Sequence, residues 1–382
     1  MARRRFIVAQ FLDSSNAFVR QVAPAKTRAT LRWNAASSAY LTLPDNHAIV
    51  PTLVGEDGIR CAVWMVTIDN LVLSRRRLVL GRVGSVTGDD APFGTVTVPV
   101  QDDWQDLANM LGWQVPGAPI TGQNASEYAR YTGTSEDNAK AAIAANATRL
   151  GRPWDVAPSL GRGDPATAPL ELRMHELGDK IMPPLINDRL QLTHEYDDTT
   201  GRWLVDVREG EVFPRPITPQ SGVLGRWSWV HQPPTATRAI VGGRGDGTAR
   251  EFALVIDTAL EAELGVALEI YVDARNAEAG ADLAPYGWAE LAKHRGKAGL
   301  TATLRETSWF RFADGYELGD KVRVQVGALD VEDVISQVDI THDTNGGFDT
   351  VPKVGLAIED PTERLVGFVR HVATAVRGLE KR

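Results

Sequence analysis

Short apolar runs separated by turn residues restrict the fold of residues 1–100 more than any other feature. The runs span residues 6–12, 29–33, 39–43, 59–66, 71–84 and 94–100, and in them Val, Ile, Leu and Trp alternate with polar residues. Such alternation is typical of strands that bury one face. Many short strands at regular spacing indicate a sheet that closes as a barrel or packs as a sandwich. We therefore predict a first β-barrel domain over residues 1–100.

A second, mixed domain is predicted over residues 101–221, where apolar residues change to helical spacing. An Ala-rich segment over residues 134–150 predicts a helix, since Ala is the best helix former. Another helix is predicted over residues 170–188, with a bend or an end at Pro183 and its neighbour. Residues 190–207 predict two strands joined by a polar turn.

A glycine-rich turn between two apolar runs predicts a β-hairpin over residues 235–256. We place this hairpin at the centre of a second β-barrel domain, which spans residues 222–256 and 310–345. Residues 257–309 are predicted to form a small inserted domain that contains a helix over residues 281–296. The predicted fold class is α+β and mainly β, with two antiparallel β-barrels, two smaller α/β domains and a C-terminal helix.

The last segment, residues 346–382, is predicted to be a linker followed by that helix. Asp360 is a natural N-cap, and Pro361 occupies the first helical position. Apolar residues then recur at intervals of three and four and form one narrow seam. A short seam is marginally stable alone, so it must pack against its own domain, in a three-fold bundle or on another protein. The candidate oligomer or partner contacts are Leu365, Phe368, Val372, Ala375 and Leu379.

Motifs for reaction chemistry are missing from the sequence. No G-x-S-x-G nucleophile elbow occurs, and no two of the seven histidines have the spacing of a zinc-protease helix. Cys61 is the only cysteine, which excludes an internal disulfide and a multi-cysteine zinc site and fits assembly in a reducing cytoplasm. The glycines at 242–247 lack the Gly-Lys-Ser or Gly-Lys-Thr of a phosphate-binding loop. We predict no enzyme, catalytic residue, cofactor or metal.

Two further patterns have a structural and a functional interpretation. His342 and Asp343, together with Asp339, could hold a cation, but the Asp-Thr-Asn-Gly-Gly run is more typical of a turn. Trp227 and Trp229 point to one face of a predicted strand, where they would suit stacking on a sugar. Core packing or a subunit contact is the interpretation that we favour for these tryptophans.

The charge of the chain argues against a dedicated DNA-binding protein. The formal net charge is −8, and the short basic runs at 3–5 and 75–77 are typical of solvated surface. No apolar run approaches the roughly 18 residues that would span a bilayer. The apolar run at 6–12 is also too short for the core of a secretion signal, so we expect none.

Sequence blocks in the second half of the chain resemble a known family. The blocks are Gly222 to Arg250 with its two tryptophans and the Gly242-Gly243-Arg244-Gly245 turn, Tyr271 to Arg275, and Gly315 to Val322. They are similar to blocks of minor tail proteins, or distal tail hub proteins, from siphophages that infect actinobacteria. The resemblance covers most of the chain, from about Ala29 to Ile340.

The resemblance implies two related β-barrels with two smaller domains, similar to the baseplate hub of contractile phages. It implies a homotrimer that joins the sixfold tail tube to the threefold tip and forms part of the DNA exit channel. Expected partners are the distal tail protein, the tape measure protein and downstream tail-tip or receptor-binding proteins, with genomic DNA passing without specific binding. The expected location is the phage tail tip of the virion, after assembly in the host cytoplasm. Alternatives are a host-glycan-binding tail module and a cell-wall hydrolase.

Overall fold

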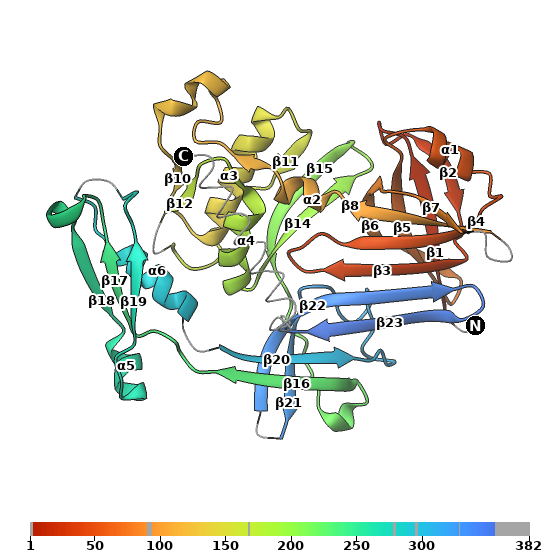
Figure 1. Ribbon diagram of the computed structural model, residues 1–382. Coiled ribbons are helices and arrows are strands. Elements are labelled where there is room, and N and C mark those ends of the chain that lie inside the picture. The colour runs from red at the N-terminus through yellow and green to blue at the C-terminus, as the bar shows by residue number, and fades with distance from the viewer. Residues whose placement is uncertain are drawn as a thin grey trace.

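The large antiparallel sheet is the main feature of the computed structural model, which describes residues 3–89, 94–166, 169–277, 280–294, 297–327 and 329–355 (Figure 1). Within these residues the sheet has 13 strands in the order β16-β20-β23-β22-β3-β4-β8-β6-β5-β1-β2, with β21 paired to β22 and β7 to β8. The strands are β1 (Arg4–Leu12), β2 (Phe18–Val22), β3 (Lys26–Arg32), β4 (Ser38–Pro44), β5 (Arg60–Asp69), β6 (Val72–Val83), β7 (Thr87–Asp89), β8 (Thr95–Asp102), β16 (Leu224–Gln232), β20 (Lys297–Leu304), β21 (Lys321–Val326), β22 (Leu329–Asp343) and β23 (Gly347–Val354).

Alternating burial along the strands explains why the sequence forms this sheet. In β4, for example, Ala39, Leu41 and Leu43 are buried while the residues between them are not. Residues with this period bury one face of a strand. The strand pattern predicted for residues 6–100 is therefore confirmed in outline, and helix α1 (Val50–Gly55) lies between β4 and β5.

The prediction of two closed barrels is not confirmed, because the strands of both predicted barrels lie in one sheet. Strand β3 from the first predicted barrel pairs with β22 from the second, with Ala29 opposite Ile340. The two sets of strands also share one core, in which Phe11 and Leu41 belong to the same buried cluster as Phe310. Among the described strands, the sheet has β16 at one edge and β2 at the other, so its two edges are different strands. Alternation fixes the buried face of a strand but not the partner of each edge.

A mixed unit follows the first eight strands and has its own core. Buried Leu107, Ile143, Ile181 and Val205 pack together in it. Its helices are α2 (Trp104–Ala108), α3 (Ser135–Arg149) and α4 (Leu177–Asn187), with the 3-10 turns η1 (Ile120–Ala125) and η2 (Pro219–Ser221). Its strands are β9 (Leu111–Gly112), β10 (Ala129–Tyr131), β11 (Trp154–Val156), β12 (Leu170–Leu172), β13 (His175–Glu176), β14 (Leu190–Asp197) and β15 (Arg202–Glu209).

The helices and the hairpin predicted for this unit are largely confirmed. The helix predicted to end at Leu150 ends at Arg149, and β14 pairs with β15 as the predicted hairpin. The helix predicted over residues 170–188 begins later, at Leu177, because Leu170–Leu172 pairs with β10. This helix continues past Pro183 to Asn187, and its buried face, which includes Leu185, packs in the core of the unit.

A small outer unit contains the predicted hairpin, but not in the predicted place. Strands β17 (Arg238–Gly242) and β18 (Phe252–Ile256) pair as a hairpin, and their sheet is completed by β19 (Glu269–Asp273) rather than by the large sheet. The hairpin is thus not the centre of a barrel. The unit also contains η3 (Gly247–Ala249), α5 (Thr258–Leu264) and α6 (Ala284–His294).

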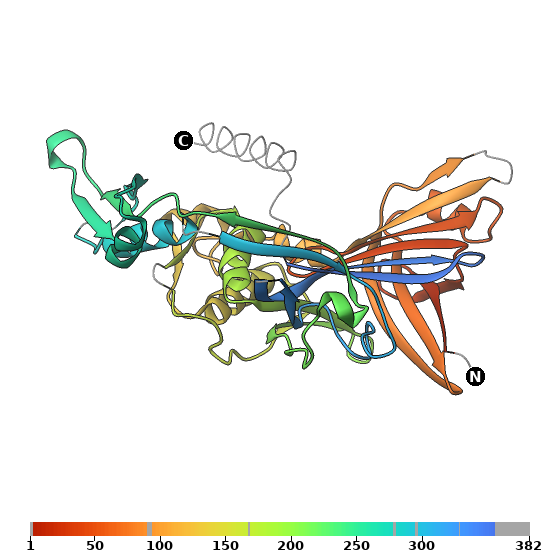
Figure 2. The same cartoon turned by 90° about the horizontal axis from the view of Figure 1, so that it is seen from below.

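Strand β20 lies in the segment predicted as an insert, yet it pairs with β16 in the large sheet. Figures 1 and 2 place the outer unit at one end of the molecule and the N-terminal strands at the other. The chain thus leaves the large sheet after β16, forms the outer unit and returns through β20.

Candidate functional site

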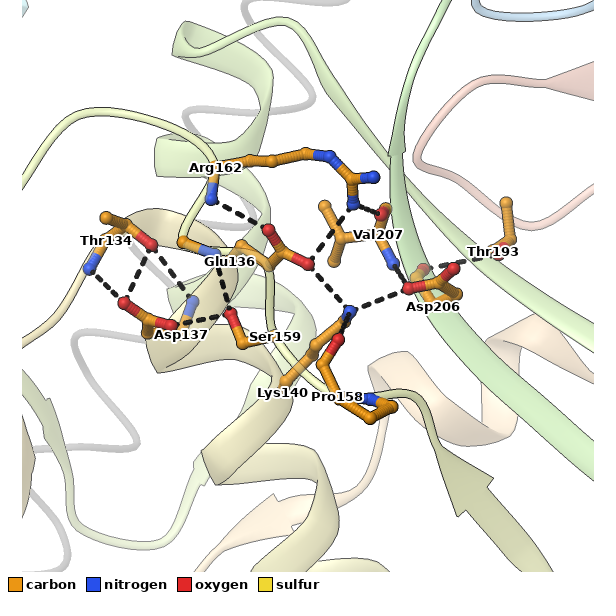
Figure 3. Close-up of polar contacts among 11 residues, drawn as sticks. Thr134, Glu136, Asp137, Lys140, Pro158, Ser159, Arg162, Thr193, Asp206 and Val207 are labelled. Atoms are coloured by element: carbon orange, nitrogen blue, oxygen red, sulfur yellow. Dashed lines mark hydrogen bonds and ion pairs between the residues drawn. The ribbon is translucent and has the colours of Figure 1, made fainter.

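The polar centre of the mixed unit is a buried ion pair in the first turns of α3. Glu136 and Lys140 are both buried and lie one helical turn apart, so their side chains meet on one face. Lys140 Nζ lies 2.7 Å from Glu136 Oε1 and 2.7 Å from Asp206 Oδ1 of β15, and it donates to the carbonyl oxygen of Pro158 at 3.0 Å (Figure 3). An ammonium group has three donors. All three therefore have an acceptor, and Lys140 presents no free amine.

Arg162 completes this network from the loop that follows β11. Its backbone N–H donates to Glu136 Oε2 at 2.8 Å, and its guanidinium donates to Glu136 Oε1 at 3.3 Å and to the carbonyl of Val207 at 2.5 Å (Figure 3). Burial raises the pKa of Glu136, but the hydrogen bonds from Lys140 and from the Arg162 backbone outweigh burial and hold the pKa below its ordinary value. The network thus joins α3, the loop and β15.

The N-terminus of α3 fixes the position of Glu136. Thr134 is the N-cap, and its hydroxyl accepts from the backbone N–H of Asp137 while the Asp137 carboxylate accepts from the backbone N–H of Thr134. Ser159 of the loop donates to the same carboxylate at 2.5 Å. This capping box satisfies helix N–H groups that would otherwise lack partners. We conclude that the cluster in Figure 3 holds a loop in place and offers no reactive group.

An aromatic cluster lies where the mixed unit meets the large sheet. The His194 ring stacks on Trp203 with ring centres 4.2 Å apart and meets the edge of Trp154 at 4.7 Å. Trp203 in turn packs with Ala62 and Leu80 of the large sheet. Both ring nitrogens of His194 are inaccessible to solvent and have no hydrogen-bond partner among the described residues. Burial lowers the pKa of His194 to about 3, so the ring is neutral.

Two arginines of β6 form ion pairs, Arg77 with the mixed unit and Arg76 with the segment before β21 of the large sheet. Arg77 contacts Asp198 at 3.1 Å and donates to the carbonyl of Tyr196, and Arg76 contacts Glu317 at 2.7 Å. Arg76, Arg77, Tyr196 and Asp198 line a cavity of about 340 Å³ between β6 and β14. The basic run at residues 75–77 was predicted to be solvated surface; Arg75 is exposed, and the side chains of Arg76 and Arg77 are partly exposed, at 42% and 20%. Because Arg76 and Arg77 already have carboxylate partners, they are not free to bind an anion in the cavity.

The residues considered for a cation site, 339–343, form the end of β22 and lead into the turn to β23. Asp339 pairs with Lys353 at 2.8 Å, and Asp343 accepts from the backbone N–H of Asn345 at 2.9 Å at the turn between β22 and β23. In the part of the chain that the structure describes, no three His, Cys, Asp or Glu side chains form a group that could hold a metal ion. Cys61 is buried, and burial raises the pKa of its thiol.

The two tryptophans of β16 are exposed on the large sheet. Trp227 is 43% exposed and Trp229 is 57% exposed, so the core-packing interpretation is wrong and a contact with another molecule remains. Trp227 also borders a groove of about 520 Å³, which we call the β16 groove. The other residues that line the groove include Arg226, Lys353 and Gly355. No carboxylate lines it among the described residues, so its border is basic.

The five predicted contact residues of the C-terminal segment, Leu365, Phe368, Val372, Ala375 and Leu379, lie outside the described residues. The residues of the Figure 3 network were not predicted as a site either. Their only signal in the sequence is the i, i+4 spacing of Glu136 and Lys140, which is equally typical of an exposed helix face. Among the described helices, none has the length and apolar character that a bilayer crossing requires.

The fold is that of phage tail proteins. The structure is similar to the 43 kDa tail protein of prophage MuSo2 from Shewanella oneidensis, with a TM-score of 0.52, 16% identity and coverage of 91% of this chain and 97% of that chain. It is also similar to the prophage tail protein gp18 from Listeria monocytogenes EGD-e, with a TM-score of 0.52, 9% identity and coverage of 97% and 99%. A tail protein from Neisseria meningitidis MC58 has a TM-score of 0.51, 12% identity and coverage of 92% and 97%.

A family model matches most of the chain. The model for the Siphovirus ReqiPepy6 Gp37-like protein family matches residues 23–355, which include all of the large sheet from β3 onward. The chain belongs to this family. No curated protein matches the sequence.

Proposed function

We propose that this chain is a structural protein of the virion and forms the trimeric hub at the distal tail tip of a siphophage. The hub would join the sixfold tail tube to the threefold tip and would form part of the DNA exit channel. Family membership and the tail-protein fold support a place in the tail. The observation that carries the proposal is the open large sheet, whose two unlike edges both present apolar side chains to solvent.

The two edges suit contacts that run from one copy to the next. Edge strand β16 exposes Trp227 and Trp229, and edge strand β2 exposes Phe18. A contact between unlike surfaces repeats around an axis and forms a ring when the rotation closes. Packing of Trp227 and Trp229 on β16 against Phe18 on β2 of the next copy would thus bury these apolar side chains through side-chain contacts, without strand pairing across the interface. Exposed apolar clusters on a soluble protein commonly mark such interfaces.

The proposal includes the partners that a tail-tip hub requires. These are the distal tail protein, the tape measure protein and downstream tail-tip or receptor-binding proteins, in a phage of an actinobacterial host. Segment 346–382, with Leu365, Phe368, Val372, Ala375 and Leu379, would supply a further oligomer or partner contact. The net charge of −8 favours passage of DNA without specific binding, because phosphate attraction requires clustered basic residues.

We expect the purified chain to be a trimer of the 41.6 kDa protomer when mass is measured by light scattering over a dilution series. Replacing both β16 tryptophans with alanine should weaken the trimer by about 30-fold or more, since a buried Trp often contributes about 2 kcal/mol to an interface. Trp288→Ala is the control, because Trp288 is also exposed but lies on α6 of the outer unit. A chain that stays monomeric at all concentrations and is missing from labelled tail tips would refute the proposal.

A host-glycan-binding module is the second candidate, and the exposed β16 tryptophans are the observation that favours it. Exposed aromatic rings can stack on sugars, and Trp227 borders a groove large enough for a small ligand. The two functions differ in what covers these rings. Glycan-array binding that is lost in Trp227→Ala, without any change of oligomeric state, would favour the glycan module.

A further inference from the structure

Strand β18 of the outer unit is an edge strand that lacks the usual protection against pairing. Its sequence, Phe-Ala-Leu-Val-Ile over Phe252–Ile256, contains no charged residue and no proline. On one side it pairs with β17, and no described strand pairs with its other side. Proteins commonly protect sheet edges with charges, proline or bulges, because an open edge is a template for another strand.

The backbone of β18 offers hydrogen-bonding groups on this open side. The N–H of Gly243 donates to the carbonyl of Glu251 at 2.9 Å, and the N–H of Asp257 donates to the carbonyl of Thr237 at 2.9 Å. Hydrogen-bonded pairs occur at every second position of an antiparallel ladder. The residues that bond to β17 are therefore those at positions 251, 253, 255 and 257. The residues between them, at positions 252, 254 and 256, direct their N–H and C=O groups away from β17.

The same residues place apolar side chains on an uncovered face. Phe252 is 62% exposed, Leu254 is 56% exposed, and Tyr271 on β19 is 53% exposed. Leu254 and Tyr271 both pair with Ile240, so their side chains lie on the same face of the sheet. The opposite face is covered by α6, where Leu291 packs with the buried core of the unit. One face of the three-stranded sheet thus supports the fold, and the other is available to a partner.

Other exposed edges in the described chain differ from β18. Strand β2 contains Arg20 and pairs irregularly with β1, and β16 contains Arg226 and has a register shift against β20. Strand β19 begins with Glu269 and ends with Asp273. Charges and irregular pairing both oppose the addition of a strand. Edge strand β18 has neither, since its pairing with β17 is regular over all five residues.

Charge next to β18 indicates the chemistry of the partner. Arg250 already pairs with Asp273, and Arg238 already pairs with Glu261. Glu251, which immediately precedes β18, is exposed and has no ion pair among the described residues, so this end of the strand presents a carboxylate to a partner. A second copy of β18 is a poor partner, because antiparallel pairing about Leu254 would place Glu251 opposite position 257, which is also acidic. Like charges directly opposite each other are destabilising.

We propose that β18 binds an extended segment of a neighbouring tail protein, which adds a fourth strand to the β18-β17-β19 sheet. The segment has apolar residues at alternate positions and Lys or Arg at its ends. Main-chain hydrogen bonds to positions 252, 254 and 256 supply the pairing, and the exposed apolar face supplies specificity. The neighbour is a tail protein only if the proposed function is correct. The binding test below needs neither a trimer nor a tail, so the two proposals can fail separately.

The test measures binding of a labelled peptide, Lys-Val-Thr-Val-Thr-Val-Lys, to the full chain by fluorescence anisotropy. Leu254→Pro should weaken binding by about tenfold or more, since it removes an N–H that points to the partner while proline is tolerated on an edge strand. The matched control Leu254→Thr keeps this N–H and should bind far more tightly than Leu254→Pro. A peptide with Glu in place of both Lys should bind less tightly than the basic peptide.

Hydrogen exchange gives the second measurement. Peptide binding should slow the exchange of the amides at positions 252, 254 and 256 in the wild-type chain. Lack of saturable binding by the basic peptide, or equal binding to wild type and Leu254→Pro, would overturn the proposal. The amides at these positions could also exchange slowly without peptide while the mass doubles with concentration. That result would show that a second copy covers the edge and would also overturn the proposal.

Discussion

Replacing Lys140 with methionine is expected to lower the free energy of unfolding by about 3–5 kcal/mol, the usual cost of removing one partner from a buried ion pair. The ammonium group is the closest cation to Glu136, which is fully buried, and it also contacts Asp206 and the carbonyl of Pro158. Methionine keeps the length of the side chain but provides no donor. Urea unfolding followed by tryptophan fluorescence measures the change.

The double variant Glu136→Gln/Lys140→Met is the control for this prediction. Glutamine removes the carboxylate charge, which in Lys140→Met keeps only the longer contact to the Arg162 guanidinium at 3.3 Å, and its oxygen can still accept from the N–H of Arg162. Stability should therefore recover in part, because an apolar or neutral replacement of both partners costs less than the loss of one. If the free energy of unfolding of Lys140→Met lies within about 1 kcal/mol of the wild-type value, the ion pair does not behave as a buried one.

Local signals in the sequence predicted individual elements well. Thr134 can cap α3 because the capping contact joins residues only three positions apart. The β17-β18 hairpin is similarly defined by its own turn, where Gly245 has a positive φ of 106° that favours glycine. Such features depend on residues close together in the chain, so alternation, caps and turns are sufficient to find them.

Pairing between strands that lie far apart in the sequence could not be predicted from these local signals. Nothing in Ala29 or Ile340 indicates that β3 and β22 are neighbours, and this one pairing merges the strands of two predicted barrels into one sheet. The third strand of the β17-β18 sheet could not be predicted for the same reason, since β19 follows only after α5. Apolar periodicity shows that a strand has a buried face, but many partners would satisfy that need.

Burial of charged residues was the other feature that the sequence did not reveal. Glu136 and Lys140 lie in an Ala-rich helix, where such a pair is ordinarily a solvated one. Their burial depends on Asp206 and Arg162, which come from β15 and from a loop. Conversely, Trp227 and Trp229 were expected to be buried by the core or by a subunit, and the structure leaves both of them exposed.

Acid is expected to destabilise the protein through His194, whose pKa of about 3 in the folded chain is far below the ordinary 6.5. Because the folded-state pKa is the lower one, the unfolded chain binds the proton first as the pH falls. The contribution to stability is therefore complete above pH 6.5 and is lost progressively below it, until the folded state also binds the proton near pH 3. At about pH 5 the expected loss from this residue alone is about 2 kcal/mol.

His194→Phe isolates this contribution, because phenylalanine preserves the stacking on Trp203 and the edge contact with Trp154 but does not titrate. The ring nitrogens of His194 have no described partner, so the substitution breaks no hydrogen bond. Between about pH 7.5 and about pH 5, the stability of the variant relative to wild type should increase by about 2 kcal/mol. All other titrating groups are common to both proteins and cancel in the difference. A difference that does not change with pH would mean that His194 can take up a proton in the folded protein, contrary to its position between two tryptophans.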